Sequence, residues 1–334
     1  RRRSAKLRYL SSTLIIAALS TTAAIAQTKT IAIDGSSTVF PVSEAIAEEF
    51  QKSTKGAVRV TVGISGTGGG FKKFCRGETD ISNGSRPILK EEIEACKQAG
   101  VEFYEIPIAF DALTVAVSPR NNFVGDCITV ADLKKIWEPA AQGKVMNWSD
   151  VRQGWPNQKI TLYGAGADSG TFDYFTEAVV GKAKASRGDY TASEDDNVLV
   201  QGIENDANSL GYIPYAYYAP HASKMKALAV DGGKGCVKPS LEAVTAGTYN
   251  PLSRPLFIYV SKKATEKPEV KQFVEFAMKN SIPLIEEVKY LPLPEPAYQA
   301  ALKKFNEGKT GSVFGGVPEV GVSIDDLMKR EARG

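Results

Sequence analysis

Four turns of similar composition contain the residues that could do chemistry in this sequence. They lie at residues 34–41, 65–70, 83–87 and 164–171, and most combine serine or threonine with glycine after an apolar segment typical of a strand. Hydroxyl groups and unobstructed glycine amides donate hydrogen bonds, and a following helix adds free N–H groups and a partial positive charge. Any one turn alone is equally well an ordinary strand–helix connection. The recurrence of these turns predicts an anion-binding site.

The candidate donors are nearly all uncharged. Arg86 is the only cation inside one of these turns; its guanidinium could hold an oxyanion bidentately, and a surface arginine before a proline is the alternative. Each hydrogen bond to a charged partner contributes roughly 1.5–3 kcal/mol, whereas stripping water from a bare ion costs far more. The anion must therefore be enclosed on all sides, which a cleft between two lobes provides.

Enzymatic alternatives find little support in the sequence. His221 is the only histidine, so a Ser–His–Asp triad would have to use it. The patterns G-x-S-x-G, G-x-x-x-x-G-K-[ST] and G-x-G-x-x-G after a strand do not occur. We expect neither catalytic residues nor a cofactor, and the cysteines do not have metal-ligand spacing with a histidine.

Residues 1–26 have the composition of a secretory signal peptide: a basic head, an apolar stretch at 14–19, and the small-x-small site Ala24–Ala26. An N-terminal membrane anchor is the alternative. The chain has 41 Lys and Arg against 38 Asp and Glu, and removing the five basic residues of 1–26 leaves 36 against 38, about −2. The mature chain therefore gives no charge argument for nucleic-acid binding.

Four cysteines in an exported chain favour disulfides. Of the three possible pairings we favour Cys75–Cys96 and Cys127–Cys236, because each pair then lies inside one expected domain. Free buried thiols are the alternative.

The length of 334 residues predicts two domains of ordinary size. Apolar runs predict strands at 28–33, 58–64, 160–163 and 254–260, and two adjacent strands within 103–117, broken by Pro107 and Asp111. Helical spacing predicts helices at 42–50, 71–76, 90–99, 197–208, 266–280 and 297–307, with Ser37 or Thr38 capping the first.

Several motifs, in this order, resemble the periplasmic phosphate-binding proteins, which receive the substrate of phosphate ABC importers. They are Asp34–Val39, Ser65–Gly70, Thr79–Ile81 with Ser85–Pro87, Ile108–Leu113, Ile136–Trp137 with Asn147–Trp148, Ser169–Thr171 and Arg254–Phe257. The resemblance implies an α/β, two-lobed type II periplasmic binding protein fold with two crossover strands and phosphate in the cleft. Lobe I would comprise 27–116 plus 250–334, and lobe II 117–249, with hinges near 115–120 and 245–254.

The resemblance also implies the site residues. Ser37 and Thr38 would bind phosphate, Thr38 partly through its N–H. Ser65 and Thr67 would come from the second turn, and which hydroxyl points inward stays open. Ser169, Gly170 and Thr171 would come from the opposite lobe.

Two positions depart from the family pattern. Where members often have an aspartate and an arginine, this chain has Ser85 and Ala165. We hypothesise that Arg86 supplies the cation and Ser85 a hydroxyl. Phosphate at neutral pH has a proton that sulfate lacks. Either another acceptor, for which Asp168 is a candidate, receives this proton, or selectivity against sulfate rests on something else.

The sequence thus predicts an exported, periplasmic, monomeric receptor for inorganic phosphate. The resemblance implies a permease and ATPase complex in the inner membrane as its partner. The alternatives are a receptor for another tetrahedral oxyanion such as sulfate, and a secreted phosphoester hydrolase or adhesion protein on the same fold.

Overall fold

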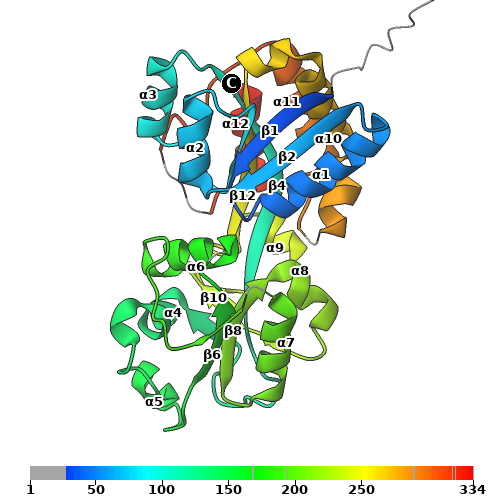
Figure 1. The fold of residues 1–334 in the computed structure, drawn as a ribbon. Coiled ribbons are helices and arrows are strands. Elements are labelled where there is room, and N and C mark those ends of the chain that lie inside the picture. The colour runs from blue at the N-terminus through cyan, green and yellow to red at the C-terminus, as the bar shows by residue number, and fades with distance from the viewer. Residues whose placement is uncertain are drawn as a thin grey trace, which may run out of the picture.

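The structure is a computed structural model that describes residues 28–333 apart from 168, 194, 289, 318 and 320. Two lobes lie end to end and are joined by extended chain (Figure 1). The expected signal peptide and Asp168 lie outside the described residues. Among the described residues, no helix combines the length and the apolar character needed to cross a membrane.

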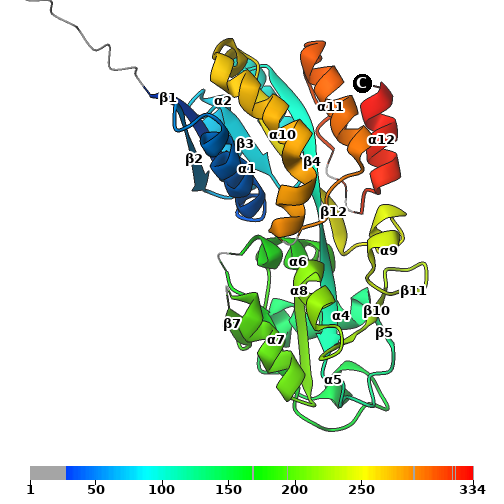
Figure 2. The ribbon, with the colours of Figure 1, turned by 90° about the vertical axis from the view of Figure 1, so that its right-hand side faces the viewer.

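Lobe I contains the N-terminal elements and the C-terminal helices, which come together although they are far apart in the chain (Figure 2). In chain order its elements are β1 (Lys29–Gly35), α1 (Phe40–Ser53), β2 (Val58–Ile64), α2 (Thr67–Cys75), β3 (Ile81–Gly84) and α3 (Lys90–Gln98), then, after lobe II, β12 (Ser253–Ser261), η3 (Lys263–Glu266), α10 (Pro268–Glu287), α11 (Glu295–Asn306) and α12 (Ile324–Arg333). The predicted boundaries at 116/117 and 249/250 stay predictions.

Lobe II is formed by the middle of the chain, after the long strand β4 (Phe103–Val117) leaves lobe I. Its elements are β5 (Cys127–Thr129), α4 (Val130–Trp137), η1 (Pro139–Ala141), α5 (Trp148–Val151), β6 (Thr161–Ala165), α6 (Gly170–Val180), β7 (Thr191–Ser193), α7 (Asp196–Asn205), β8 (Ser209–Pro214), α8 (Tyr215–Tyr218), η2 (Ala219–His221), β9 (Lys226–Ala227), β10 (Ala229–Asp231), β11 (Cys236–Val237) and α9 (Leu241–Thr245).

One sheet runs through both lobes in the order β2-β1-β3-β12-β4-β8-β6-β7, and β9 also pairs with β4. Residues 103–112 of β4 pair with β12, and residues 113–117 pair with β8. β1 is parallel to β2 and β3, and β6 is parallel to β8. The hydroxyl-rich turns follow the carboxyl ends of β1, β2, β3 and β6, which is where open α/β sheets bind ligands.

The prediction of two adjacent strands within 103–117 is wrong, because β4 is a single strand, buried along its whole length. Pro107 is accommodated by an irregularity in the pairing, where the register shifts between Leu256 and Phe257 of β12. A bulge tolerates a proline because the local ladder is already interrupted. Asp111 is accommodated because it lies directly opposite Arg254.

Two helix termini also differ from prediction. α1 begins after Val39 with no side-chain cap, and the Oγ of Ser36 instead accepts from the N–H of Thr38 at 3.1 Å. α10 continues beyond residue 280 through Pro283, because its last turns still bury apolar side chains such as Ile285. Burial offsets the hydrogen bond that the proline removes.

Disulfides join Cys75 to Cys96 and Cys127 to Cys236, the two pairs favoured from the sequence. The first links α2 to α3 in lobe I, and the second links β5 to β11 in lobe II. Each crosslink restricts the unfolded chain and typically stabilises a fold by about 2–4 kcal/mol. The α2–α3 bond fixes two elements that flank the turns at 65–70 and 83–87.

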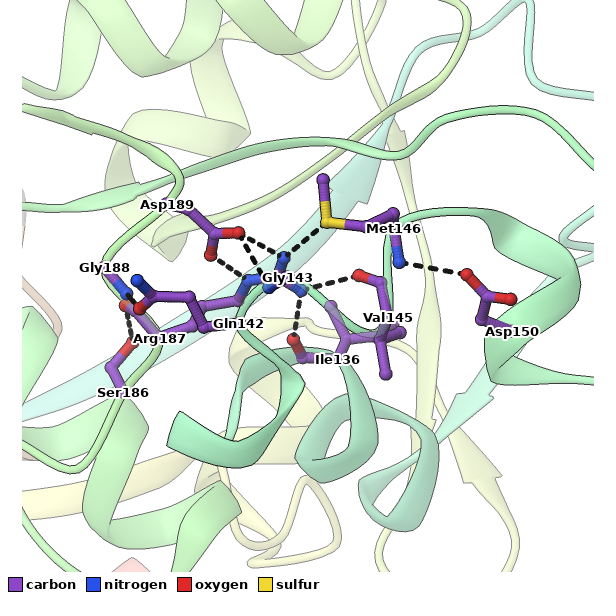
Figure 3. Close-up of polar contacts among 10 residues, drawn as sticks. All are labelled: Ile136, Gln142, Gly143, Val145, Met146, Asp150, Ser186, Arg187, Gly188 and Asp189. Atoms are coloured by element: carbon purple, nitrogen blue, oxygen red, sulfur yellow. Dashed lines mark hydrogen bonds and ion pairs between the residues drawn. The ribbon is translucent and has the colours of Figure 1, made fainter.

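A buried arginine holds the loops of lobe II together (Figure 3). Arg187 donates from Nε and Nη2 to both carboxylate oxygens of Asp189, at 2.6 and 2.9 Å, and from Nη1 to the carbonyls of Ile136 and Val145, at 3.0 and 2.9 Å. Its side chain is 2% exposed. Since Ile136 lies in the last turn of α4, Arg187 satisfies a carbonyl that the helix leaves unpaired.

Candidate anion-binding site

The N-terminus of α2 lies directly against the turn after β1. The first hydrogen bond of this helix runs from Gly70 N to Gly66 O at 2.8 Å, so the amides of residues 67–69 have no acceptor within the helix. A Cβ on Gly70 would come within 2.6 Å of the Cα of Gly35, so only glycine permits this approach. Three donors and the positive end of the helix dipole therefore lie beside the β1 turn.

The hydroxyl of Thr67, the first residue of α2, contacts the hydroxyl of Ser85, which follows β3. Their oxygens are 2.9 Å apart, and the Ser85 N–H donates to Thr67 Oγ1 at 3.1 Å. The two hydroxyls have two hydrogens, and only one is used between them whichever oxygen donates. One hydrogen therefore stays available for an anion.

Arg254, at the start of β12, connects the separate parts of the site. Its Nη1 donates to the Ser85 carbonyl at 3.0 Å, and its Nη2 donates to Thr38 Oγ1 at 3.4 Å. Its Cζ lies 3.8 Å from the ring centroid of Tyr174, which is on α6 of lobe II. The guanidinium is buried, so it places a positive charge between hydroxyls of lobe I and an aromatic face of lobe II.

Asp111 faces Arg254 across the pair of strands. Its Oδ2 lies 3.8 Å from Arg254 Nη2, and among the described residues this buried oxygen has no hydrogen-bond donor. Burial raises the pKa of Asp111, while the charge of Arg254 and the N–H of Ala112 oppose the rise. A buried carboxylate oxygen without a donor is costly, so this position favours a ligand that brings a proton.

The three predicted residues of the opposite lobe lie at the start of α6. Ser169 is the N-cap residue, and its Oγ accepts from the N–H of Thr171 at 3.1 Å. Gly170 is the first helical residue. Tyr174 follows Thr171 by three positions, which puts both on one face of the helix. This face contacts Arg254 through the ring of Tyr174. The Tyr174 hydroxyl also donates to the carbonyl of Pro251.

Thr38 and Ser37 follow the carboxyl end of β1. Thr38 is fully buried and presents its hydroxyl to Arg254, whereas its N–H donates to Ser36. The expected amide contribution of Thr38 is therefore directed to a neighbouring side chain in this structure. Ser37 is partly exposed, whereas its neighbours Ser36 and Thr38 are buried.

The second turn divides its two hydroxyls. Ser65 is exposed and its hydroxyl donates to Asp34 Oδ1, while Lys73 Nζ binds Asp34 Oδ2 at 2.8 Å. Thr67 instead meets Ser85. Of the two candidates that the sequence left open, Thr67 is the one brought beside Ser85 and Arg254.

The guanidinium of Arg86 is bound by Glu92. Its two terminal nitrogens donate to the carboxylate of Glu92 at 2.8 and 2.9 Å, and Glu92 Oε2 also accepts from Leu89 N at 2.9 Å, before the start of α3. Its Cζ lies 5.8 Å over the ring of Phe71. The bidentate pair fixes the loop after β3 to α3.

Sequence reasoning missed Arg254, Asp111 and Tyr174. The sequence places Arg254 in a strand and Asp111 at a break between strands, and both lie in motifs shared with the phosphate-binding proteins, but neither is predicted as a ligand. The available signal was charged residues inside two strongly apolar segments, Arg254 in one and Glu105 and Asp111 in the other, since buried charges require partners. Their pairing becomes evident only once β4 and β12 are in register.

Two other candidate chemistries have no geometric support. The Nδ1 of His221 lies 2.8 Å from the carbonyl of Tyr217, one helical turn earlier. Within the described ranges, no three His, Cys, Asp or Glu side chains gather closely enough to hold a metal ion.

Comparison with known proteins gives consistent matches over most of the chain. The family model "PBP superfamily domain" matches residues 20–281. The chain is 52% identical over 309 residues to Protein SphX of Synechococcus elongatus, which covers 92% of this chain and 90% of that protein. It is 37% identical to the phosphate-binding protein PstS of Staphylococcus saprophyticus, covering 82% and 83%. A crystal structure described as a possible phosphate-binding protein from Planctomyces limnophilus matches with a TM-score of 0.78 at 48% identity, covering 84% and 99%.

Proposed function

This chain belongs to the PBP superfamily, among its phosphate-binding proteins, and we propose that it captures inorganic phosphate between its two lobes and delivers it to an ABC importer. Members of this family are substrate-binding proteins, and we extend this to the present chain as a receptor that binds phosphate without turning it over. The proposal includes export to the periplasm, a monomeric state, and a permease and ATPase complex as the docking partner.

The observation that supports the proposal most is the position of Arg254. One guanidinium contacts Thr38 and Ser85 in lobe I and lies against Tyr174 in lobe II. A receptor that closes on a small anion needs hydrogen-bond donors from both lobes at one site from which water is excluded. Only many hydrogen bonds offset the hydration that the anion loses.

We assign the phosphate ligands to the hydroxyls of Thr38, Thr67 and Ser85, the guanidinium of Arg254, and the start of α6 with its residues 169–171. Ser37 stays a candidate beside Thr38. We assign Ser65 and Arg86 to holding the turns in place, since Asp34 and Glu92 already bind their polar groups.

We further assign the role of proton acceptor to Asp111. Hydrogen phosphate has an O–H that can donate to the Asp111 oxygen, which has no other donor among the described residues. Sulfate has no proton at neutral pH and would present an unprotonated oxygen to that carboxylate. This assignment supplies the negatively charged acceptor that Ser85, at the position where relatives often have an aspartate, cannot provide.

Calorimetry with phosphate and sulfate tests the proposal against its alternatives. We expect one phosphate per chain and much weaker binding of sulfate at pH 7.5. Equal affinities would favour a general oxyanion receptor. Turnover of a chromogenic phosphate ester, lost in Ser65→Ala, would favour the hydrolase. Purified protein that binds no anion would favour a surface-adhesion role.

A further inference from the structure

A small pocket opens beside Arg254 where the lobes meet. It encloses about 30 Å³ and is lined by Ser85 and Arg86, by Tyr174 and Glu177 of α6, by Arg254, and by Glu319 of the C-terminal segment. A cavity needs only about 10–15 Å³ of such space to hold one water molecule, so this pocket has room for a small substituent. Ser85 and Arg254 also belong to the proposed phosphate site, so a substituent on the bound phosphoryl group would extend into this pocket.

The positive charge of Arg86 is already matched inside the pocket wall. Glu92 binds its guanidinium through both terminal nitrogens. Burial lowers the pKa of Arg86, but the hydrogen bond and charge of Glu92, with a smaller contribution from Glu177, raise it above its usual value. Glu177 of one lobe therefore faces Arg86 of the other without forming an ion pair with it.

Glu319 is fixed at the other side of the pocket. Arg330 donates to its two oxygens at 2.7 and 2.6 Å, and the same guanidinium lies 4.9 Å over the ring of Phe314. Glu177 is held differently, since it follows Tyr174 by three residues on α6 and is thus on the face that meets Arg254. Within the part of the chain that the structure describes, no ion pair involves Glu177.

Resting on the proposed function, we propose that Glu177 and Glu319 make the site reject phosphate compounds that have a second negative charge next to the phosphoryl group. Such a charge would enter a pocket in which both arginines already have an anionic partner. Glu92 binds the guanidinium of Arg86, and the bound phosphoryl group binds that of Arg254. The second charge would face the carboxylate of Glu177, which has no ion pair among the described residues, and that of Glu319, whose charge Arg330 partly offsets. Like charges that share a pocket repel each other. Free phosphate has no substituent and does not meet them.

Two ligands of nearly equal size separate charge from space. Phosphonoacetate has a carboxylate beside its phosphonate, and the amide of phosphonoacetate has a neutral group of the same shape. Calorimetry at pH 7.5 should show the amide binding the unaltered protein at least tenfold more tightly than phosphonoacetate. In Glu177→Gln this preference should shrink, and in Glu177→Gln with Glu319→Gln it should fall below threefold.

Glu266→Gln is the matched control, because Glu266 is exposed and belongs to η3, outside this pocket. It should keep the full preference for the amide. Equal affinities in the unaltered protein, or an unchanged preference in the double variant, would overturn the proposal. Failure of both compounds to bind any of these proteins would also overturn it, because space alone would then reject them. Loss of phosphate binding by the unaltered protein would instead refute the proposed function.

Discussion

Arg254 is the residue whose replacement tests the site most severely. Arg254→Met keeps the volume of the side chain but removes its charge and its donors to Thr38 and Ser85. Two hydrogen bonds from the guanidinium to bound phosphate would contribute about 3–6 kcal/mol together to the binding free energy, and the lower figure corresponds to roughly a hundredfold in affinity. We therefore expect phosphate to bind at least a hundredfold more weakly.

The same change affects folding through Asp111, which would keep no cation in contact. Leaving one partner of a buried pair typically costs about 3–5 kcal/mol of stability, although here a carboxyl with a raised pKa can take up a proton instead. The variant is therefore also made as Arg254→Met with Asp111→Asn, which removes the unpaired charge. Urea unfolding and circular dichroism establish that each protein is folded before calorimetry.

Arg187→Met is the control, because Arg187 is as deeply buried but belongs to the loops of lobe II. Losing its bonds to Asp189 and to two carbonyls should lower the unfolding free energy by a few kcal/mol while phosphate affinity stays within threefold. A folded Arg254→Met protein that binds phosphate within tenfold of the unaltered chain would refute the reasoning.

Three further predictions follow from the same contacts. Arg86→Gln should change the free energy of phosphate binding by less than about 1 kcal/mol in calorimetry, since Glu92 occupies the guanidinium; a larger loss would return Arg86 to the ligand set. Asp111→Asn should narrow the preference for phosphate over sulfate at pH 7.5, and an unchanged ratio would exclude Asp111 as the proton acceptor. Burial raises the pKa of Glu105 to about 7, so the folded protein binds a proton that the unfolded chain, with a pKa near 4.5, has released. Unfolding free energy measured in urea should therefore fall as the pH rises from about 4.5 to about 7, and Glu105→Gln should reduce that slope; an equal slope in both proteins would contradict the assignment.

Much of the fold could be predicted because local pattern and burial agree. The strand at Val58–Ile64 is confirmed with the same bounds, and the helix predicted at 90–99 is observed as α3 at Lys90–Gln98. The sequence alone could not tell whether residues 103–117 form one strand or two. Both faces of β4 are covered, so the alternation of polar and apolar residues that marks a half-exposed strand is absent. Pro107 and Asp111 are breaks by local rules, and only the bulge and the partner in β12 reverse that expectation.

The candidate site was predictable in its hydroxyls but not in its charges. Thr38, Thr67 and Ser85 belong to turns that composition identifies, and the structure brings them together around Arg254. Whether Arg86 or Arg254 faces the cluster depends on where Glu92 and Asp111 lie, and both partners are set by tertiary packing. Helical spacing predicts a helix at 90–99, but not that Glu92 in its first turn reaches back to Arg86.

The most direct test of the account is a crystal structure of this protein grown with phosphate. We predict one phosphate within hydrogen-bonding distance of Thr38 Oγ1, Ser85 Oγ, the Arg254 guanidinium and an amide at the start of α6, with one phosphate oxygen next to Asp111. A phosphate bound elsewhere, or one that contacts a single lobe and leaves Arg254 on Thr38 and Ser85 alone, would contradict it.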